Sequence, residues 1–174
     1  FCTHAHIDDA GPARERAEAG VRVTLARSTL ADMRRFSTPT YCDYMADRLV
    51  AEGVGRAEAE ELANSIWAHT TDFERDEVPF HVLDEGQMLR CGRWEFRTVP
   101  VPGHMPGQTA LWLPERGVAF TGDVVLYACS TCICFWGGSE DALGDQLATL
   151  GKVAGMGIEH AFLGHGVQEG VLAD

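Results

Sequence analysis

The first dozen residues constrain this chain most, because they carry two histidines and two carboxylates within six positions. Residues 3–12 hold His4, His6, Asp8 and Asp9 ahead of a glycine and a proline. Imidazole nitrogens and carboxylate oxygens are the ligands that zinc, manganese and iron prefer. Neighbouring side chains in a turn diverge, so this run provides only part of a metal site. The fold must therefore bring further ligands to it from elsewhere in the chain.

Three later positions can supply those ligands, and each lies in a loop next to an expected strand. His104 stands in a Pro-Gly-His-Met-Pro-Gly turn, where glycines and prolines hold the chain in a tight conformation. Asp123 comes directly after a strand that ends at Phe120, and His165 stands between two glycines after the last strand. Polar residues at the ends of strands are where sheet scaffolds usually present their chemistry. We therefore expect these three residues to complete the metal site.

The first half of the chain predicts helices around one short strand. A proline at the start and a glycine at the end predict a helix over residues 13–19, and alternation predicts a strand over 21–25. Residues 28–70 have helical character, and Thr40 with Asp43 three positions on predicts a capping box. We interpret 28–70 as a helical insert that separates the two halves of the metal site.

From residue 79 the pattern changes to short runs bounded by turn residues, which predicts an antiparallel meander. The expected strands lie at 82–83, 88–90, 94–99, 109–113 and 117–120. A helix capped by Ser139 and a last strand over 158–163 complete the prediction. The sequence therefore indicates one α+β domain over residues 1–174.

Length, charge and hydropathy exclude several classes of protein. A chain of 174 residues can bury a sizeable core without disulfides or metals as staples. The net charge of −12 argues against a protein that reads the nucleic-acid backbone, which requires a basic face. No stretch approaches the roughly 20 apolar residues of a membrane span, and no secretory leader is visible. With six cysteines in such a chain, we expect a cytoplasmic protein with reduced thiols and no membrane partner.

The four motifs stand in the order His-x-His-x-Asp, Pro-Gly-His-x-Pro-Gly, Thr-Gly-Asp and Gly-His-Gly, between residues 3 and 166. This order resembles the metallo-β-lactamase superfamily, and it is most similar to the hydrolases related to glyoxalase II, thioesterases and lactonases. The segment 136–150 also fits that subgroup. The resemblance implies an αβ/βα sandwich with the metals at one edge, between two β-sheets.

The same resemblance implies a role for each candidate ligand. The first metal site is matched by three histidines, His4, His6 and His104. The second site is matched by Asp8 and His165, and Asp123 matches the carboxylate that bridges both ions. Three neutral imidazoles leave one tetrahedral position for a water, whose pKa falls toward about 7 beside the cations. The implied cofactor is one or two zinc ions. The implied reaction is attack of a metal-bound hydroxide on a carbonyl, with Asp8 and Asp123 as catalytic residues.

Asp9 departs from the family pattern, which usually places a histidine after the aspartate. As a ligand, it would exchange a nitrogen for an oxygen at the second site, which suits manganese, iron or magnesium better than zinc. The alternative is that Asp9 is solvated and the second site stays empty. Gln108 and Val124 also stand where relatives often carry histidine, which removes two possible supporting side chains.

The chain begins on the first motif, whereas the family normally places several β-strands before it. We therefore expect an N-terminally truncated sandwich with an exposed sheet edge or face that must be covered. A homo-oligomer that covers this surface and a longer parent chain are both consistent with this expectation.

A Cys-Ser-Thr-Cys-Ile-Cys run places Cys129, Cys132 and Cys134 in a loop that is usually proline-rich and polar in relatives. Such a run can bind a soft metal or form a disulfide, but no second cysteine pair has zinc-site spacing. We expect buried or half-buried thiols that line the mouth of the site. Three further histidines lack ligand neighbours and are interpreted as surface or core residues: His69, His81 and His160.

Three functions remain open. The leading hypothesis is a metal-dependent hydrolase of a small ester, thioester or lactone, with residues 28–70 as a lid or pocket wall. The second is a catalytically silent relative that keeps the scaffold for binding or assembly, which Asp9, Gln108 and the missing strands favour. The third is a phosphodiesterase, a nuclease or a β-lactamase on the same site, although the net charge of −12 disfavours a nuclease.

Overall fold

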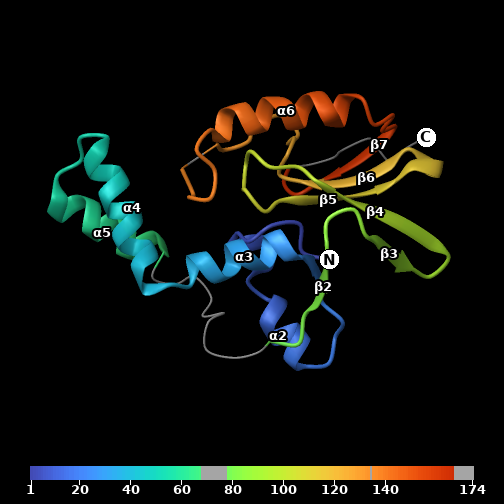
Figure 1. Ribbon diagram of the computed structural model, residues 1–174, viewed down its shortest axis with the longest axis horizontal. Helices are drawn as coiled ribbons and strands as arrows, with labels where there is room; N and C mark the ends of the chain where they lie inside the picture. Colours follow the sequence, from blue (N-terminus) through green and yellow to red (C-terminus); the bar gives the residue numbers. More distant parts are fainter. Residues whose placement is uncertain (68–77, 134, 167–174) are drawn as a thin grey trace.

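The computed structural model describes residues 1–67, 78–133 and 135–166 (Figure 1). The helices are α1 (Ile7–Ala10), α2 (Ala13–Glu18), α3 (Arg27–Phe36), α4 (Pro39–Ala51), α5 (Arg56–Trp67) and α6 (Ala142–Ala154), with a 3-10 helix η1 (Pro114–Arg116). The strands are β1 (Thr24–Ala26), β2 (His81–Leu83), β3 (Met88–Cys91), β4 (Trp94–Pro100), β5 (Thr109–Leu113), β6 (Val118–Gly122) and β7 (His160–Leu163). This content confirms the predicted α+β class.

Five strands form one sheet in the order β3-β4-β5-β6-β7, and β1 and β2 form a second, two-stranded sheet. From β3 to β6 each strand pairs antiparallel with the next, as the short turns between them predict. β7 pairs parallel with β6, because α6 carries the chain back across the sheet between the two strands.

Strand β2 does not belong to the meander, so the prediction for residues 82–83 is wrong in its pairing. β2 pairs parallel with β1, with Leu25 opposite Val82. The helical stretch α3–α5 lies between the two strands in the sequence, and a connection of that length permits a parallel crossover. β1 is also shorter than the predicted strand over 21–25, since Val21 is exposed and the strand begins at Thr24.

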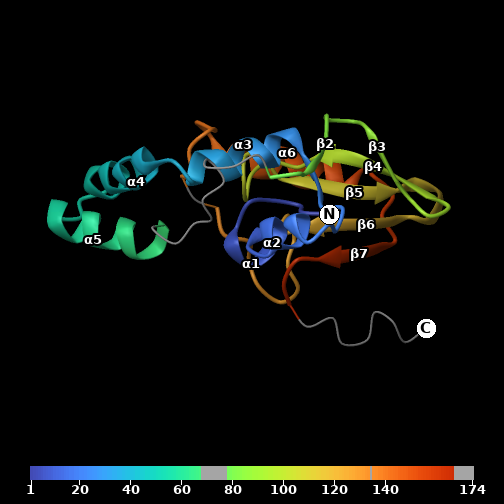
Figure 2. The same ribbon diagram turned by 90° about the horizontal axis from the view of Figure 1, so that it is seen from below.

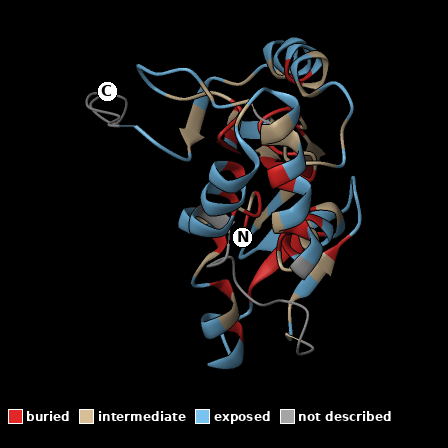
Figure 3. Cartoon of the chain, turned by 90° about the vertical axis from the view of Figure 1, so that its left-hand side faces the viewer, coloured by how far each residue is buried: buried red, intermediate tan, exposed pale blue. Residues whose placement is uncertain are grey.

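Helix α6 lies along one face of the five-stranded sheet (Figure 1). Val153 of this helix packs there against a small core cluster that includes Val101 and Ala110. Buried residues line the inner faces of the helices and sheets, while the outer faces are exposed (Figure 3). In the three described ranges, none of the helices has both the length and the apolar composition of a bilayer span.

Two predicted helix starts are each displaced by two residues. α6 begins after Asp141, whose carboxylate accepts a hydrogen bond from the Gly144 N–H at 2.8 Å, instead of after Ser139. Asp141 adjoins the first helical residue, so its oxygen can reach an N–H group of the first turn. α4 begins at Pro39, because the fixed φ of proline suits the first helical position. Thr40 therefore lies inside the helix and is not its cap.

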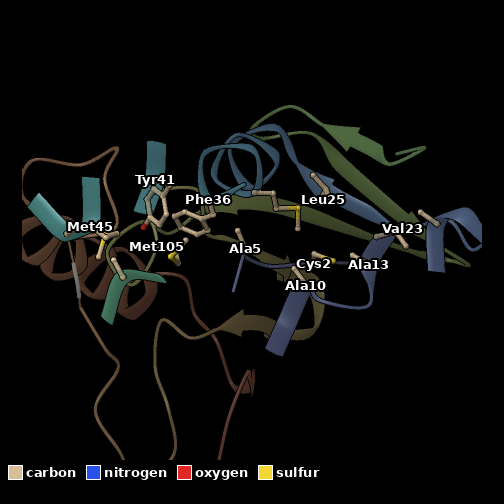
Figure 4. Close-up of a cluster of buried hydrophobic side chains, with 14 of the residues drawn as sticks. Cys2, Ala5, Ala10, Ala13, Val23, Leu25, Phe36, Tyr41, Met45 and Met105 are labelled. Atoms are coloured by element: carbon tan, nitrogen blue, oxygen red, sulfur yellow. The ribbon is translucent and has the colours of Figure 1, made fainter. Parts of the chain in front are cut away.

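Helix α3 and strand β1 belong to the larger core cluster (Figure 4). Leu25 of β1 and Phe36 of α3 pack in this cluster together with Ala5 and Met105. Ala5 stands between the two histidines of the first motif, and Met105 directly follows His104. The core therefore anchors both segments that carry the candidate ligands.

Helices α4 and α5 pack on each other and project to one side of the two sheets (Figures 1 and 2). Ala59 and Ala63 of α5 are fully buried and belong to the larger core cluster. The Tyr41 hydroxyl of α4 donates to the Trp136 carbonyl at 3.1 Å. The described part of the predicted insert, residues 28–67, thus divides into α3 and the projecting pair α4–α5, and both parts contribute buried residues to the larger core cluster.

Candidate metal centre

The first motif passes between the two sheets. The Cys2 N–H donates to the Thr24 carbonyl of β1 at 2.9 Å, and the Thr109 N–H of β5 donates to the Thr3 carbonyl at 2.9 Å. The backbone is therefore tied to one sheet and then to the other just before His4. The His4 side chain is fully buried at this junction.

Three histidine side chains converge close to one carboxylate. His6 Nδ1 lies 3.1 Å from His4 Nε2 and 3.0 Å from His104 Nε2. Asp123 Oδ2 lies 3.9 Å from His4 Nε2 and 3.5 Å from His104 Nε2. A tetrahedral zinc with bonds of about 2.0–2.1 Å holds its ligand atoms roughly 3.3 Å apart. The spacing of these four residues, which we name the first ligand group, is close to that of the ligands of one metal ion.

The converging nitrogens of the first ligand group carry lone pairs. Burial, together with the neighbouring His6 and His104, lowers the pKa of His4 to about 2. Burial and His104 lower the pKa of His6 to about 4. His104 Nδ1 lies 2.6 Å from the Cys132 carbonyl, which can only accept, so Nδ1 donates and Nε2 keeps its lone pair. Neutral imidazole is the form of histidine that binds a metal.

Asp8, Asp9 and His165 form a second ligand group beside the first. α1 begins directly after His6 and carries both carboxylates on its first turn. His165 Nε2 lies 3.2 Å from Asp8 Oδ2 and 3.6 Å from Asp9 Oδ2. Asp8 and His165 are exposed, whereas Asp9 is half-buried.

Asp123 lies between the two ligand groups. Its Oδ2 is 3.5 Å from His104 Nε2 of the first group and 3.5 Å from His165 Nε2 of the second. The ends of β6 and β7 approach so closely that a Cβ at Gly164 would collide with Asp123 Oδ1. Parallel pairing of these two strands therefore places Asp123 and His165 side by side, in the arrangement that a bridging ligand requires.

The combined site carries an excess of negative charge. Burial, followed by repulsion from Asp123 and Asp8, raises the pKa of Asp9 to about 6. Burial also raises the pKa of Asp123. Asp123 Oδ1 is buried and accepts no hydrogen bond from any residue that the structure describes. Because buried polar atoms are normally satisfied, this set of nitrogen and oxygen donors fits one or two divalent cations.

Other residues singled out in the sequence lie outside the two ligand groups. Gln108 is buried and donates from Nε2 to the Thr121 carbonyl at 3.1 Å, and Val124 packs in the small core cluster. His81 belongs to β2, and His160 is exposed on β7. Gln108 and Val124 therefore make contacts within the fold instead of with the ligands. His81 and His160 both lie outside the two ligand groups.

The cysteine loop differs from the prediction. Cys129 and Cys132 are exposed, so the expectation of buried or half-buried thiols is wrong for both. The loop reaches the ligands through its backbone, at the Cys132 carbonyl, and leaves these two side chains in solvent. Cys134, His69 and residues 68–70 of the predicted insert lie outside the described residues.

Two side chains next to the ligands were not predicted. Thr131 Oγ1 donates to the Asp123 carbonyl at 2.5 Å and lies 3.3 Å from His104 Nδ1. The Trp136 ring lies edge-on to the His6 ring, with centroids 4.8 Å apart. A threonine and a tryptophan in an irregular loop carry no metal-binding pattern, so only the folded chain reveals these contacts.

The family model described as the metallo-beta-lactamase superfamily matches residues 1–165. The chain belongs to the metallo-β-lactamase superfamily. The membership that the four ordered motifs predicted is thereby confirmed.

Two curated relatives each match about half of the chain. A hydroxyacylglutathione hydrolase of Cereibacter sphaeroides is 35% identical over 98 residues, which are 54% of this chain and 38% of that protein. The mitochondrial persulfide dioxygenase ETHE1 of Mus musculus is 30% identical over 91 residues, which are 52% of this chain and 33% of that protein. The matched segment thus spans well under half of each relative.

Solved structures match the fold over almost the whole chain. A metallo-beta-lactamase family protein from Thermus thermophilus superimposes with a TM-score of 0.73 and 25% identity, over 95% of this chain and 53% of that one. TTHA1623 in a di-iron-bound form gives a TM-score of 0.60 and 23% identity, over 95% of this chain and 68% of that one. The predicted superfamily fold is therefore confirmed, and the chain covers about half the length of the Thermus protein.

Proposed function

We propose that this superfamily member is a metal-dependent hydrolase of a small ester, thioester or lactone. The observation that carries the proposal is the convergence of three histidine nitrogens and Asp123, next to an exposed second ligand group. The 35% identity over 98 residues to a hydroxyacylglutathione hydrolase supports hydrolysis. This similarity supports the proposed substrate class, and so does the resemblance of the motifs to those of glyoxalase II, thioesterases and lactonases.

For the cofactor we propose zinc at the first ligand group and zinc, manganese or iron at the second. Three imidazoles and one carboxylate suit zinc, which favours nitrogen over oxygen more than manganese does. The second ligand group offers two carboxylates and one imidazole, and Asp123 adds a third carboxylate beside it. This larger share of oxygen suits harder cations.

The chain's own residues divide the catalytic work by position. When bound by these residues, a divalent cation would supply Lewis acidity and would lower the pKa of a water at this centre toward about 7. Asp123 is placed to share a metal with either ligand group, since its Oδ2 lies 3.5 Å from a histidine of each. Asp8 is exposed at the mouth, where its carboxylate can orient the attacking nucleophile and accept its proton. Trp136 lies edge-on to His6 and keeps water from that side of the imidazole.

Hydrolysis of a panel of aryl esters, aliphatic thioesters and lactones by zinc-loaded protein tests this proposal. His104→Ala should lower the rate at least about 100-fold, because it removes a ligand rather than a supporting group. His160→Ala is the matched control, since this exposed histidine of β7 belongs to neither ligand group. Hydrolysis by His104→Ala at the wild-type rate would contradict the proposal.

A second candidate is a catalytically silent member that uses the scaffold for binding. Asp9 and Gln108 favour it, because both replace histidines of the family pattern and Gln108 makes a structural contact with the Thr121 carbonyl instead. Elemental analysis of protein purified without chelator separates the two candidates. One or two metal ions per chain support the hydrolase, and a metal-free protein with no hydrolysis supports the silent module.

A further inference from the structure

Asp32 and Arg35 form an ion pair on α3 whose carboxylate is buried and whose guanidinium is partly exposed. Asp32 is only 2% exposed, and its Oδ1 accepts a hydrogen bond from Arg35 Nη1 at 2.7 Å. Asp32 Oδ2 accepts from the Gly107 N–H at 2.6 Å. Thr29, one turn earlier on the helix, donates to the Gly107 carbonyl at 2.8 Å. α3 therefore holds both the N–H and the carbonyl of one residue in the loop that carries His104.

Gly107 lies in direct contact with α3. A Cβ at this position would collide with the Ser28 carbonyl and would lie 2.7 Å from Asp32 Oδ2. Only glycine lets the two backbones approach this closely. Gly107 follows His104 by three residues, and Met105 between them is fully buried in the larger core cluster. A displacement of Gly107 would therefore be transmitted to His104.

Arg35 ties the same ion pair to a second loop. Its Nη1 donates to the Gly137 carbonyl at 2.9 Å. A Cβ at the neighbouring Gly138 would lie 2.6 Å from that nitrogen, so the guanidinium occupies the space beside the glycine pair. Gly137 directly follows Trp136, whose ring lies edge-on to the His6 ring at 4.8 Å. The guanidinium thus supports the wall of the metal centre that the tryptophan forms.

We propose that Asp32 and Arg35 are positioning residues that set the distance between the His104 loop and the Trp136 wall, and thereby the metal affinity of the first ligand group. They act through the backbone of the two glycines rather than on a ligand side chain. Stability alone gives a weak reason for this pair, because the cost of removing the buried Asp32 charge from water offsets much of its attraction to Arg35. Burial raises the pKa of Asp32, although Arg35 and the Gly107 N–H both favour its charged form. The proposal rests on the metal centre of the proposed function and requires no hydrolysis.

Two substitutions test the pair. Asp32→Asn keeps the shape of the side chain and removes its charge, and Arg35→Gln removes the donor that Asp32 and Gly137 share. Zinc affinity, measured by competition with a chromophoric chelator, should fall about tenfold in each variant, as when supporting groups of metal sites are lost. The visible spectrum of the cobalt-substituted protein should change as well, because it reports ligand geometry. Arg35→Lys should recover only part of the affinity, since an ammonium lacks the planar fork of a guanidinium.

Arg27→Gln is the matched control. Arg27 lies on the same helix and pairs with Asp84 at 2.6 Å, but both side chains are exposed and Asp84 directly follows β2. Unlike Asp32 and Arg35, the Arg27 side chain makes its hydrogen bond outside the His104 and Trp136 loops. The control should keep the wild-type zinc affinity and cobalt spectrum.

Wild-type zinc affinity and cobalt spectra in folded Asp32→Asn and Arg35→Gln would overturn the proposal, and so would an equal loss in Arg27→Gln. If Asp32→Asn does not fold, the two Arg35 variants decide the question in the same way. Tight zinc binding by a wild-type protein that hydrolyses no substrate would contradict the proposed function alone. A wild-type protein that binds no zinc would contradict both.

Discussion

The two ligand groups differ in how firmly the fold holds them. His4 and His104 of the first group are 0% and 3% exposed, and hydrogen bonds from β1, β5 and the cysteine loop fix the backbone and imidazoles around them. In the second group, the side chains of Asp8 and His165 are 58% and 44% exposed. Preorganised ligands bind a metal more tightly than mobile ones, because less conformational entropy is lost on binding. The first group should therefore hold its metal more tightly.

The sequence around each group explains this difference. The first motif and the His104 loop each place an apolar residue, Ala5 and Met105, in the larger core cluster. The second group depends on α1, which has only four residues, and on the residue that lies just beyond the end of β7. A one-turn helix has little stability of its own, because nucleation is unfavourable and few hydrogen bonds follow it.

The largest expected effect separates the groups by metal content. His104→Ala should lower the affinity for the first zinc at least about 100-fold, since it removes a buried ligand. His165→Ala should remove only the second ion and leave about one tightly bound zinc per chain. Elemental analysis after dialysis, with calorimetric titration of zinc, measures both. If both variants lost the same number of zinc ions, the two groups would not bind metal independently, and the proposed difference between them would be wrong.

His6 of the first group and Asp9 of the second should give the stability of the metal-free protein pH dependences of opposite sign. Burial lowers the pKa of His6 to about 4 from an ordinary 6.5, so between these values the unfolded chain binds more protons and stability rises with pH. Burial raises the pKa of Asp9 from 3.8 to about 6, so between these values the folded protein binds more protons and stability falls as pH rises. Each effect reaches at most about 1.4 kcal/mol per pH unit.

Variants isolate these two contributions. Relative to His6→Asn, the free energy of unfolding of the wild type should increase from pH 4.5 to pH 6. Relative to Asp9→Asn, it should decrease over the same interval. Urea unfolding in the presence of EDTA at several pH values measures both differences. If both differences changed with pH in the same direction, the assigned pKa shifts of His6 and Asp9 would be wrong.

Asp9→His sharpens the chemical side of the comparison. Exchanging an oxygen for a nitrogen at the second group should raise its preference for zinc over manganese about tenfold, because imidazole is the softer ligand. The preference is measured as the ratio of bound zinc to bound manganese after the protein is dialysed against equal concentrations of both metals. Asp47→His is the control, since Asp47 is an exposed residue of α4 that pairs with Arg56. An unchanged ratio in Asp9→His would mean that Asp9 is not a ligand.

The smallest expected effect lies outside both groups. Gly151 stands inside α6, and a Cβ there would meet open space. Gly151→Ala should raise the free energy of unfolding by about 0.5–1 kcal/mol, because alanine is the better helix former. Zinc affinity should stay at the wild-type value, which makes this variant a check that stability and metal binding are separable. If Gly151→Ala lowered the free energy of unfolding, the position would not have room for a Cβ.

Local patterns predicted most elements because turns and periodicity act over a few residues. The strands expected at 94–99 and 109–113 lie at Trp94–Pro100 and Thr109–Leu113. The partner of β2 was predicted wrongly and the direction of β7 was not predicted, because both pairings join segments that a helical connection separates. The same limit applies to Thr131 and Trp136, whose contacts with the ligands depend on the path of an irregular loop.

The sequence by itself determined which atoms can bind a metal and in what order they occur. Seven side chains with suitable nitrogen or oxygen atoms stand in ordered motifs, and the family follows from that order. Only the tertiary structure decided how those atoms are grouped, that one group is buried and the other exposed, and that Asp123 lies between them. It also decided that Asp32 and Arg35 bind the backbones of the two loops that carry His104 and Trp136. These features arise from contacts between segments far apart in the chain, such as Asp32 with Gly107 and Arg35 with Gly137, which no local pattern records.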